Sequence, residues 1–479
     1  MRAAAKYACP VIAIVTFMTP LATAQTLTTL YSFGPPDGVW PLAGLVQGTD
    51  GSFYGTTSNG GAQEAGTVFR ISRDGELKTL YNFCQDQHCS SGEYPKAALV
   101  QAGDGDFYGT ASAGGVPYNN VSNGTVFKIT PNGQFTLLHT FCSLNGGCPD
   151  GALPLAPLVQ AGNGDFYGTT SGGGSYDGYT CNGDLGCGTV FKMTPRGVLT
   201  TLHEFCVDTS CPDGHTPYDG LLQGSDGVFY GTTLYGGVNN SGTVFEITPD
   251  EQLTTVSSFA GCYSTTCANG AGPESGLTEA ANGGLYGATT EGGPFGAGIV
   301  FKMTAGERTT VAAPAAGAPL SALVEGTDGN LYGSSGDTLI RITPEGAVTT
   351  LYTFCTQTGC PDGAVPEGSL IQATDGAFYG ATFQGGVNNY GTIFRLSVGL
   401  DPFVLTRPTY GEAGTSVEIL GTDLAGASSV TFNGKSGAFT VLQPSLIITT
   451  VPPGATTGTV RVATPRGTLS SNVTFRVRH

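Results

Sequence analysis

The chain has 479 residues, of which 76 are glycine and 28 are proline, and only 11 % are charged. Glycine costs about 1 kcal/mol per helical position relative to alanine, so this composition excludes a helical bundle or a coiled coil. Hydrophobic residues make up 39 % of the chain and aromatic residues 10 %, which is too much apolar material for a disordered protein, so a turn-rich all-β fold remains.

The first 24 residues predict a signal peptide. Arg2 and Lys6 precede an apolar run from Val11 to Met18, and the segment ends in Ala22-Thr23-Ala24. A charged start, a short apolar core and a small-x-small end are typical of a cleaved export signal, whereas a membrane span needs a longer apolar run. We therefore expect an exported protein (secreted, at the cell surface or periplasmic) without a transmembrane segment.

The remaining chain is strongly acidic. Without the signal it has 17 basic and 36 acidic residues, which gives a net charge of −19. Such a surface repels nucleic acid and anionic lipid, and no basic patch compensates for it. We therefore expect no nucleic-acid partner.

Residues 25–400 consist of seven repeats. A Tyr-Gly pair that follows Phe or Leu recurs about every 54 residues. Each repeat predicts four short strands: one like LAGLVQ at 42–47, then FYGTT, then one like GTVFRIS at 66–72, and a fourth of the LTTLYSF type. Asx-Gly turns between such runs are strong hairpin signals, and radially repeated four-stranded units form a β-propeller, here with seven blades. The repeated tyrosines are Tyr54, Tyr108, Tyr167, Tyr230, Tyr286, Tyr332 and Tyr379.

The two ends of the repeat array are offset by one strand. A fourth-type strand at 27–33 precedes any complete repeat, whereas the last repeat stops at GTIFRLS near Ser397. We predict that the N-terminal strand completes the last blade and closes the ring, because closure removes exposed strand edges. A right-handed β-helix is the alternative, but its coils are generally shorter and lack hairpin turns.

Twelve cysteines remain after Cys9 of the signal, and they form six close pairs. An even count, short spacings and an exported chain favour local disulfides. A metal site would need two pairs to converge, or histidines nearby, and only His88 lies inside a pair, so we expect no metal and no cofactor. The predicted disulfides are Cys84–Cys89, Cys142–Cys148, Cys181–Cys187, Cys206–Cys211, Cys262–Cys267 and Cys355–Cys360.

The repeat motifs resemble a known family. GTVFKITP, LTTLHEFC, PDGxxP, LVQGxDGxFYGTT and a Gly-Gly pair before the next GTVF recur in fixed order over about residues 27–397. They resemble the GloVer (Gloeo/Verruco) tandem repeat of exported bacterial proteins. The resemblance implies a propeller-like surface protein and carries no enzymatic residues, and the sixth repeat, with SSGDTLIRIT at 334–343, departs most from the pattern.

Residues 401–479 lack cysteine and break the repeat. The patterns PTYGEAGTSVEILGTDL, SVTFNG, VPPGATTGTVRV and TPRGTLSSN resemble an IPT/TIG domain with an immunoglobulin-like fold. Short strands between Gly/Pro turns agree with a small β-sandwich. In exported bacterial proteins, the resemblance implies a spacer or an adhesive unit.

One set of candidate site residues ends the first strand of each repeat. This position holds glutamine in five repeats but Glu279 and Glu325 in the fifth and sixth. If the strand lines a central channel, two neighbouring carboxylates could act as acid and base on a glycan. The alternative is a ring of polar residues that bond neighbouring backbone or channel water. The glutamines are Gln47, Gln101, Gln160, Gln223 and Gln372.

A second set consists of loop aromatics that stand among asparagine and glycine. The strand order places these loops on one face, where flat rings beside amides suit the apolar faces and hydroxyls of sugars. The alternative is that the rings pack against disulfides and adjacent loops. The residues are Trp40, Tyr94, Tyr118, Tyr176, Tyr179, Tyr218, Tyr235, Tyr263 and Tyr390.

The sequence thus favours an exported, non-catalytic binding or interaction protein. We expect a monomer whose loop-rich face binds a glycan or an extracellular protein, with the C-terminal domain as a spacer. Two alternatives remain: a carbohydrate-active propeller enzyme, either a glycoside hydrolase or a polysaccharide lyase, that uses Glu279 and Glu325, and a structural envelope protein.

Overall fold

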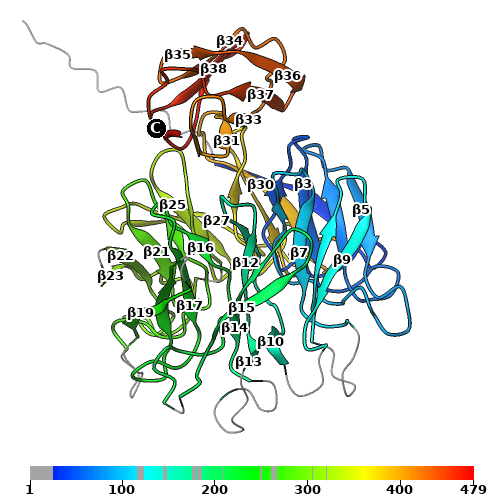
Figure 1. The fold of residues 1–479 in the computed structure, drawn as a ribbon. Coiled ribbons are helices and arrows are strands. Elements are labelled where there is room, and N and C mark those ends of the chain that lie inside the picture. The colour runs from blue at the N-terminus through cyan, green and yellow to red at the C-terminus, as the bar shows by residue number, and fades with distance from the viewer. Residues whose placement is uncertain are drawn as a thin grey trace, which may run out of the picture.

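The computed structural model describes residues 25–478 apart from 116–122, 144–147, 175–180, 182–185, 209, 249–250, 260–266, 305 and 320. Within these residues every regular element is a strand. The strands before residue 400 form seven four-stranded antiparallel sheets, consistent with propeller-like blades (Figure 1). The predicted signal peptide lies outside the described residues. In the described part, no helix has the length and apolar character that a membrane crossing requires.

We number the repeat sheets in chain order of their first strands. Sheet 1 comprises β2 (Val46–Gln47), β3 (Phe53–Thr57), β4 (Thr67–Ile71) and β5 (Leu77–Asn82). Sheet 2 comprises β6 (Val100–Gln101), β7 (Phe107–Ala111), β8 (Thr125–Ile129) and β9 (Phe135–Thr140). Sheet 3 comprises β11 (Val159–Gln160), β12 (Phe166–Thr170), β14 (Thr189–Met193) and β15 (Leu199–Glu204). Sheet 4 comprises β16 (Leu222–Gln223), β17 (Phe229–Thr233), β18 (Thr243–Ile247) and β19 (Leu253–Ser258).

The remaining repeat sheets follow the same plan. Sheet 5 comprises β20 (Thr278–Glu279), β21 (Leu285–Ala288), β22 (Val300–Thr304) and β23 (Glu307–Ala312). Sheet 6 comprises β24 (Val324–Glu325), β25 (Leu331–Ser335), β26 (Thr338–Ile342) and β27 (Val348–Thr353). Sheet 7 comprises β28 (Ile371–Gln372), β29 (Phe378–Thr382), β30 (Thr392–Ser397) and the N-terminal β1 (Thr26–Ser32).

The N-terminal strand occupies the position that the sequence predicts. β1 pairs with β30 in antiparallel register, from Thr26 opposite Ser397 to Ser32 opposite Thr392. The last repeat therefore has its fourth strand from the other end of the chain. This pairing covers the edge that β30 would otherwise expose.

The FYG motif explains how neighbouring sheets pack. Adjacent residues of a strand point to opposite faces, so the Phe and the Tyr of this motif contact different neighbours. Tyr54 of sheet 1 stacks on Phe107 of sheet 2 with ring centroids 4.0 Å apart, and Tyr379 of sheet 7 packs on Phe53 of sheet 1 at 4.1 Å. The glycine that follows makes room, because a Cβ on Gly55 would lie 2.7 Å from the ring of Phe69.

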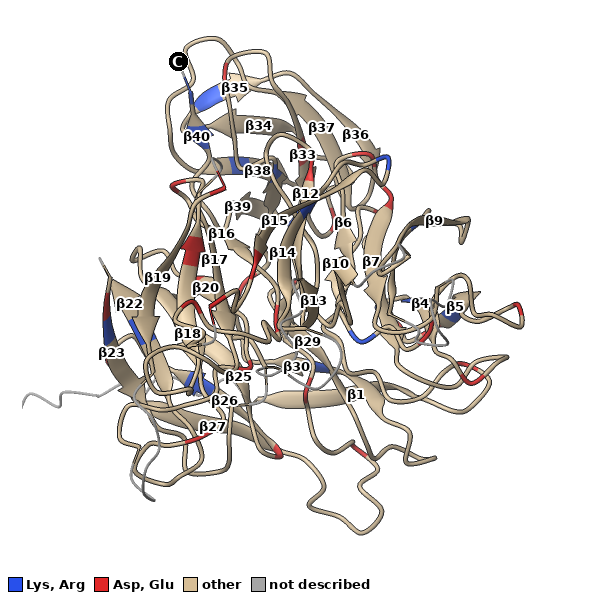
Figure 2. Cartoon of the chain, turned by 60° about the horizontal axis from the view of Figure 1, so that its bottom comes forward, with Lys and Arg blue, Asp and Glu red and all other residues tan. Residues whose placement is uncertain are grey.

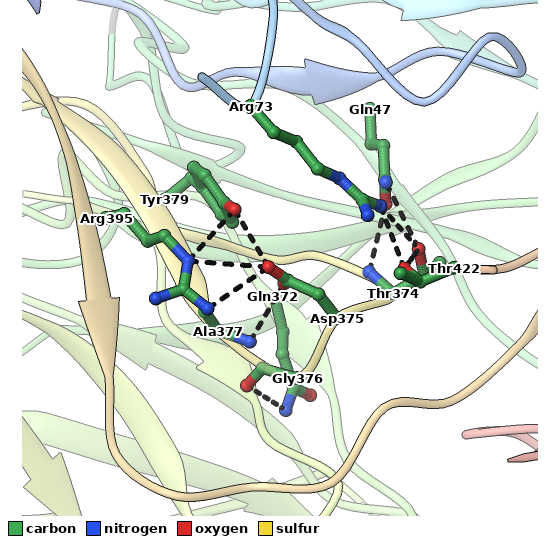
Figure 3. Close-up of polar contacts among 10 residues, drawn as sticks. All are labelled: Gln47, Arg73, Gln372, Thr374, Asp375, Gly376, Ala377, Tyr379, Arg395 and Thr422. Atoms are coloured by element: carbon green, nitrogen blue, oxygen red, sulfur yellow. Dashed lines mark hydrogen bonds and ion pairs between the residues drawn. The ribbon is translucent and has the colours of Figure 1, made fainter. Parts of the chain in front are cut away.

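In most repeat sheets the turn after the first strand holds a hydrogen bond to this tyrosine. Asp375 Oδ1 accepts a bond from the backbone N–H of Ala377, and its Oδ2 accepts one from the Tyr379 hydroxyl at 2.9 Å (Figure 3). Arg395 ion-pairs with the same carboxylate at 3.3 Å. Burial, followed by the charge of Asp375, raises the pKa of Tyr379 to about 12. Asp50, Asp226 and Asp328 make the same two bonds in their sheets, so the turn preference of Asp accounts for these positions.

We expect the Tyr379→Phe substitution to lower the free energy of unfolding by about 2 kcal/mol, because it removes the hydrogen bond to the charged Asp375 and the one that the hydroxyl accepts from Arg395. Chemical denaturation monitored by circular dichroism measures the change. Tyr286→Phe is the matched control, since the hydroxyl of Tyr286 accepts its bond from the neutral amide of Asn282. Equal losses in the two variants would show that the carboxylate adds nothing.

The C-terminal unit, residues 401–478, forms two further four-stranded sheets. One contains β31 (Leu405–Arg407), β33 (Ser416–Leu420), β36 (Phe439–Gln443) and β37 (Leu446–Thr450). The other contains β34 (Ser429–Phe432), β35 (Lys435–Gly437), β38 (Val460–Thr464) and β39 (Gly467–Ser470). A short parallel pair, β32 (Tyr410–Gly411) and β40 (Arg476–Val477), joins its ends. Val417, Ile447 and Phe475 belong to the apolar core of this unit, as expected for an immunoglobulin-like sandwich.

One further pair of strands lies outside the four-stranded sheets. β13 (Gly172–Gly174) pairs with β10 (Cys148–Ala152). Close approach explains the pairing, because a Cβ on Gly173 would lie 2.3 Å from the Gly151 backbone.

The predicted disulfides are present wherever both cysteines are described. They are Cys84–Cys89, Cys142–Cys148, Cys181–Cys187, Cys206–Cys211 and Cys355–Cys360. The sixth predicted pair includes Cys262, which lies outside the described residues.

The C-terminal unit sits on the end of the repeat sheets that carries the Asx-Gly turns (Figure 1). Arg407 donates to Gln101 Oε1 at 2.9 Å, and Thr422 Oγ1 accepts from Arg73 at 2.9 Å. Figure 3 shows Arg73, Thr374 and Thr422 meeting at this junction. Residues 25–404 carry 11 basic and 33 acidic residues, whereas residues 405–478 carry six basic and three acidic ones, some of them on β38 and β40 (Figure 2). The opposite net charges favour this docking.

Candidate functional site

Each repeat enters its first strand through a short pattern that recurs along the chain: a proline, a variable residue, two residues that are small in most repeats, and a leucine. In sheet 1 it is Pro41-Leu42-Ala43-Gly44-Leu45. The leucine is buried in the core, and the first small residue is buried as well. Small residues are needed because neighbouring segments approach closely: a Cβ on Gly44 would lie 2.9 Å from the carbonyl oxygen of Ser369 in sheet 7. The residue after the proline is left exposed or half-buried.

These segments surround a cavity of about 280 Å³, to which all seven repeat sheets contribute. We call it the central cavity. It lies where the first strands begin, whereas the C-terminal unit covers the turns at which those strands end. Its titratable lining residues are Lys96, Tyr218, Asp219, Glu274 and Glu367, and Ser321 and Ser369 line it as well.

Two glutamates of the cavity carry raised pKa values. Burial raises the pKa of Glu367, and the charge of Glu274 raises it further. Burial also raises the pKa of Glu274, with a smaller contribution from Glu291. Both carboxyl groups therefore bind their protons more tightly than an exposed glutamate does.

Tyr218 and Asp219 come from sheet 4. The Tyr218 side chain is 43 % exposed, and burial together with Glu274, Glu367 and Asp219 raises the pKa of its hydroxyl. Asp219 accepts hydrogen bonds from the backbone N–H groups of Gly220 and Gly276, both at 2.6 Å, and burial raises its pKa. Asp219 thus links sheet 4 to sheet 5 beside the cavity, and Tyr218 supplies an aromatic surface within it.

The Glu367→Gln variant is expected to raise the melting temperature at pH 7 by about 1 °C. A carboxyl with a raised pKa binds its proton more tightly in the folded chain, so stability falls as the pH rises through that value. The gain should vanish below about pH 4, where unfolded glutamate is also protonated. Differential scanning calorimetry at both pH values measures it, with exposed Glu345→Gln as the control. A gain that persists at low pH would exclude the ionisation as its cause.

Glu279 and Glu325 lie away from the central cavity. They line a cleft of about 530 Å³ between sheets 4 to 6 and the C-terminal unit, with Tyr410 and Arg476 on the other side. Glu279 Oε2 accepts a bond from the Ser225 N–H and Glu325 Oε2 from the Ala281 N–H, both at 2.8 Å. Their catalytic role stays a prediction.

The glutamines at the same position make the same kind of bond. Gln47 Oε1 accepts from the Thr374 N–H at 3.1 Å, and Gln101 Oε1 accepts from the Thr49 N–H at 3.0 Å. Each of these side chains therefore ties the end of one first strand to the turn of the neighbouring sheet. This bonding matches the polar-ring interpretation of the position.

Tyr218 is the one predicted aromatic, among those described, that lines the central cavity. Trp40 packs on Phe383 with ring centroids 5.8 Å apart, and Tyr235 packs on His215 at 5.5 Å. Tyr390 packs against the core shared by sheets 1 and 7, and Tyr94 donates its backbone N–H to Ala65 of the preceding sheet. Tyr118, Tyr176, Tyr179 and Tyr263 lie outside the described residues.

Sequence reasoning missed Lys96, Asp219, Glu274 and Glu367. A signal was present, because the residue after each proline varies within an otherwise constant segment. That position reads Leu42, Lys96, Leu155, Tyr218, Glu274, Leu320 and Glu367 along the repeats. A repeat scaffold that holds its neighbours constant and varies one position toward a cavity is a common way to build a binding site.

The structure is that of an all-β protein with propeller-like blades and an immunoglobulin-like C-terminal unit. The chain belongs to the Gloeobacter/Verrucomicrobia repeat family, whose model matches residues 15–182 and 149–337. An IPT/TIG domain model matches residues 405–477. Both findings confirm the resemblances that the sequence motifs indicated. A comparison with curated proteins finds no match.

Solved structures share the fold at low identity. Virginiamycin B lyase from Staphylococcus aureus is 17 % identical, covers 78 % of this chain and 99 % of its own, and has a TM-score of 0.51. A streptogramin B lyase structure is 18 % identical with the same coverage of this chain, 97 % of its own, and a TM-score of 0.50. The extracellular domain of a hybrid two component system from B. thetaiotaomicron is 8 % identical, covers 93 % of this chain and 58 % of its own, and has a TM-score of 0.53. These likenesses concern the fold alone.

Proposed function

We propose that residues 25–400 form a closed seven-bladed β-propeller and that residues 401–479 form the IPT/TIG domain docked on one end of it. Three observations support closure: the N-terminal strand completes the last sheet, and two side-chain contacts join the last sheet to the first. β1 pairs with β30, Tyr379 packs on Phe53, and Gln47 exchanges hydrogen bonds with Thr374. The Tyr-on-Phe contact is the same one that joins sheets 1 and 2.

The protein acts in this proposal as an exported, non-catalytic binding protein that holds a glycan in the central cavity. The observation that carries the proposal is the variable residue after the proline, which lines the cavity in the six repeats where the structure describes it, while the two residues that follow are small in most repeats. A structural role alone would not favour a tyrosine, a lysine and two glutamates at this one position.

The chemistry of the lining suits a sugar better than an apolar ligand. The exposed ring of Tyr218 offers a flat apolar surface, Lys96 offers N–H donors, and the carboxyl groups of Glu274 and Glu367 offer acceptors. Few convergent polar groups around an aromatic ring fix the orientation of a small ligand. A cavity of about 280 Å³ has room for one or two sugar rings at the end of a chain.

The position of the C-terminal unit indicates from which end a ligand reaches the cavity. Arg407, Thr422 and Ser445 bond to the turn end of sheets 1, 2 and 7, so the glycan enters from the opposite, loop-bearing end. The C-terminal unit then serves as a spacer that holds the loop end away from whatever it is attached to.

A glycan array followed by calorimetric titration tests the proposal. We expect saturable binding of one glycan per chain, with no change in the length of the glycan after incubation. Absence of any bound glycan contradicts the proposal. Cleavage of the bound glycan would instead favour the enzyme alternative and direct attention to Glu279 and Glu325.

A further inference from the structure

Two cysteine pairs that are separate in the sequence meet in the structure. Cys181–Cys187 lies between β13 and β14, and Cys206–Cys211 follows β15. One sulfur from each disulfide, on Cys181 and Cys211, lies within 4.8 Å of the other and of a ring nitrogen of His215. The sulfur atoms of Cys187 and Cys206 also lie within 4.8 Å of Cys181 and of each other. All five side chains are buried.

Backbone contacts hold these segments together independently of the sulfur atoms. The N–H of Thr216, next to His215, donates to the carbonyl of Cys187 at 2.8 Å. His215 itself forms a β-bridge with Tyr235 and stacks against its ring. The convergence therefore belongs to the fold of sheets 3 and 4 and does not depend on the oxidation state of the cysteines.

The Cys181–Cys187 pair and His215 both depart from the repeat pattern, and the two departures lie next to each other in the structure. The other cysteine pairs follow a fourth strand, whereas Cys181 and Cys187 lie between a second and a third strand. His215 stands where other repeats have apolar or acidic residues: Val39, Glu93, Ala152, Ala271 and Ala364. Disulfides that only stabilise their own loops would require neither the histidine nor the convergence of two cysteine pairs.

We propose that Cys181, Cys211 and His215, with Cys187 or Cys206 as the fourth ligand, form a zinc site when the two disulfides are reduced. Zinc prefers four thiolate and imidazole ligands in a tetrahedron, with Zn–S distances of about 2.3 Å and hence sulfur atoms about 3.8 Å apart. Sulfur atoms that already lie within 4.8 Å of one another need only small side-chain rotations to reach that arrangement.

Both disulfides must be reduced before the metal binds. Each disulfide takes up two electrons and two protons from a protein dithiol, which is left as its own disulfide. Zn²⁺ then displaces the protons of the ligating thiols, which pass to solvent. Exchange with protein disulfides, which are left as dithiols, restores both disulfides and releases the metal, so the site is open to zinc only in the reduced chain. The proposal does not depend on the glycan-binding function.

The test uses the full mature chain, reduced with a water-soluble phosphine because a dithiol reagent would itself bind zinc. Cobalt(II) serves as the spectroscopic probe and zinc as its competitor. We expect one tightly bound metal per reduced chain by native mass spectrometry, cobalt–thiolate absorption bands that zinc abolishes, and no metal on the oxidised chain. The reduced His215→Ala variant should bind at least about tenfold more weakly, since even outer-shell changes cost that much.

A cysteine control separates this site from general thiol binding. The Cys181→Ser/Cys187→Ser variant should lose the tight metal, whereas Cys355→Ser/Cys360→Ser should keep it. Equal metal binding by these two variants, or no tight metal on the reduced chain, would overturn the proposal. Circular dichroism of the reduced chain with and without zinc tests whether reduction unfolds the protein. A reduced chain that loses its fold and does not regain it with zinc would also overturn the proposal.

Discussion

Replacing Tyr218 by alanine is expected to lower glycan affinity about tenfold, which corresponds to 1.4 kcal/mol. The ring is the one aromatic surface of the central cavity within the described residues, and burying an aromatic face against a ligand contributes energy of this order. Isothermal titration calorimetry with the glycan selected on the array measures the change.

Tyr235→Ala is the matched control for this prediction. Tyr235 belongs to the same sheet and is 42 % exposed, close to the 43 % of Tyr218, but it lies on a loop against His215 and does not line the cavity. We expect its removal to leave the affinity unchanged. If Tyr235→Ala weakens binding and Tyr218→Ala does not, the ligand is bound by the loop aromatics, and the central cavity is the wrong site.

Deleting β1, residues 26–32, is expected to produce the largest loss of stability. The deletion would leave β30 as an unpaired edge and would remove Leu27, Leu30 and Tyr31 from two core clusters. These side chains are partly buried, so each contributes less than the roughly 1.5–3 kcal/mol of a fully buried one, and exposed edges promote association. Thermal unfolding and size-exclusion chromatography should show a lower melting temperature and oligomers.

Strand complementation provides the control for this deletion. A synthetic peptide with the sequence of residues 26–33 should restore the monomer and raise the melting temperature of the shortened chain, whereas a scrambled peptide should not. A shortened chain that melts like the full chain would contradict closure of the repeats by β1.

The repeat fold could be predicted because each structural role in it requires particular residue types that recur along the sequence. Phe53 and Tyr54 recur as the residues that pack sheet on sheet, Asp50 recurs as the turn residue that bonds Tyr54, and the missing fourth strand after Ser397 is matched by the extra one at the N-terminus. Regular strands with fixed turns impose these residue types, so their pattern is visible without coordinates.

The central cavity could not be predicted in the same way. Lys96, Glu274 and Glu367 are separated by more than 90 residues, and only the arrangement of the sheets around one centre brings them together. Glu279 and Glu325 differ from the glutamines at the same position of the other repeats. A carboxylate oxygen and an amide oxygen accept the hydrogen bond from a backbone N–H equally well at this position. This bond accounts for either residue type at the position, and the catalytic role of the two glutamates stays a prediction.

The contacts between the repeat sheets and the C-terminal unit could not be predicted from the sequence either. Its contacts rest on single side chains such as Arg73, Arg407 and Thr422, which belong to no repeated motif. Interfaces of this kind are set by surface shape and by individual hydrogen bonds, which leave no periodic signal along the chain.

The most direct test is hydrogen–deuterium exchange with and without the selected glycan. Binding in the central cavity predicts protection of the segments around residues 42–44, 96–98, 218–219 and 367–369, which lie far apart in the sequence and meet at the cavity. Protection confined to the outer loops, or to the cleft that contains Glu279 and Arg476, would contradict the central cavity as the binding site.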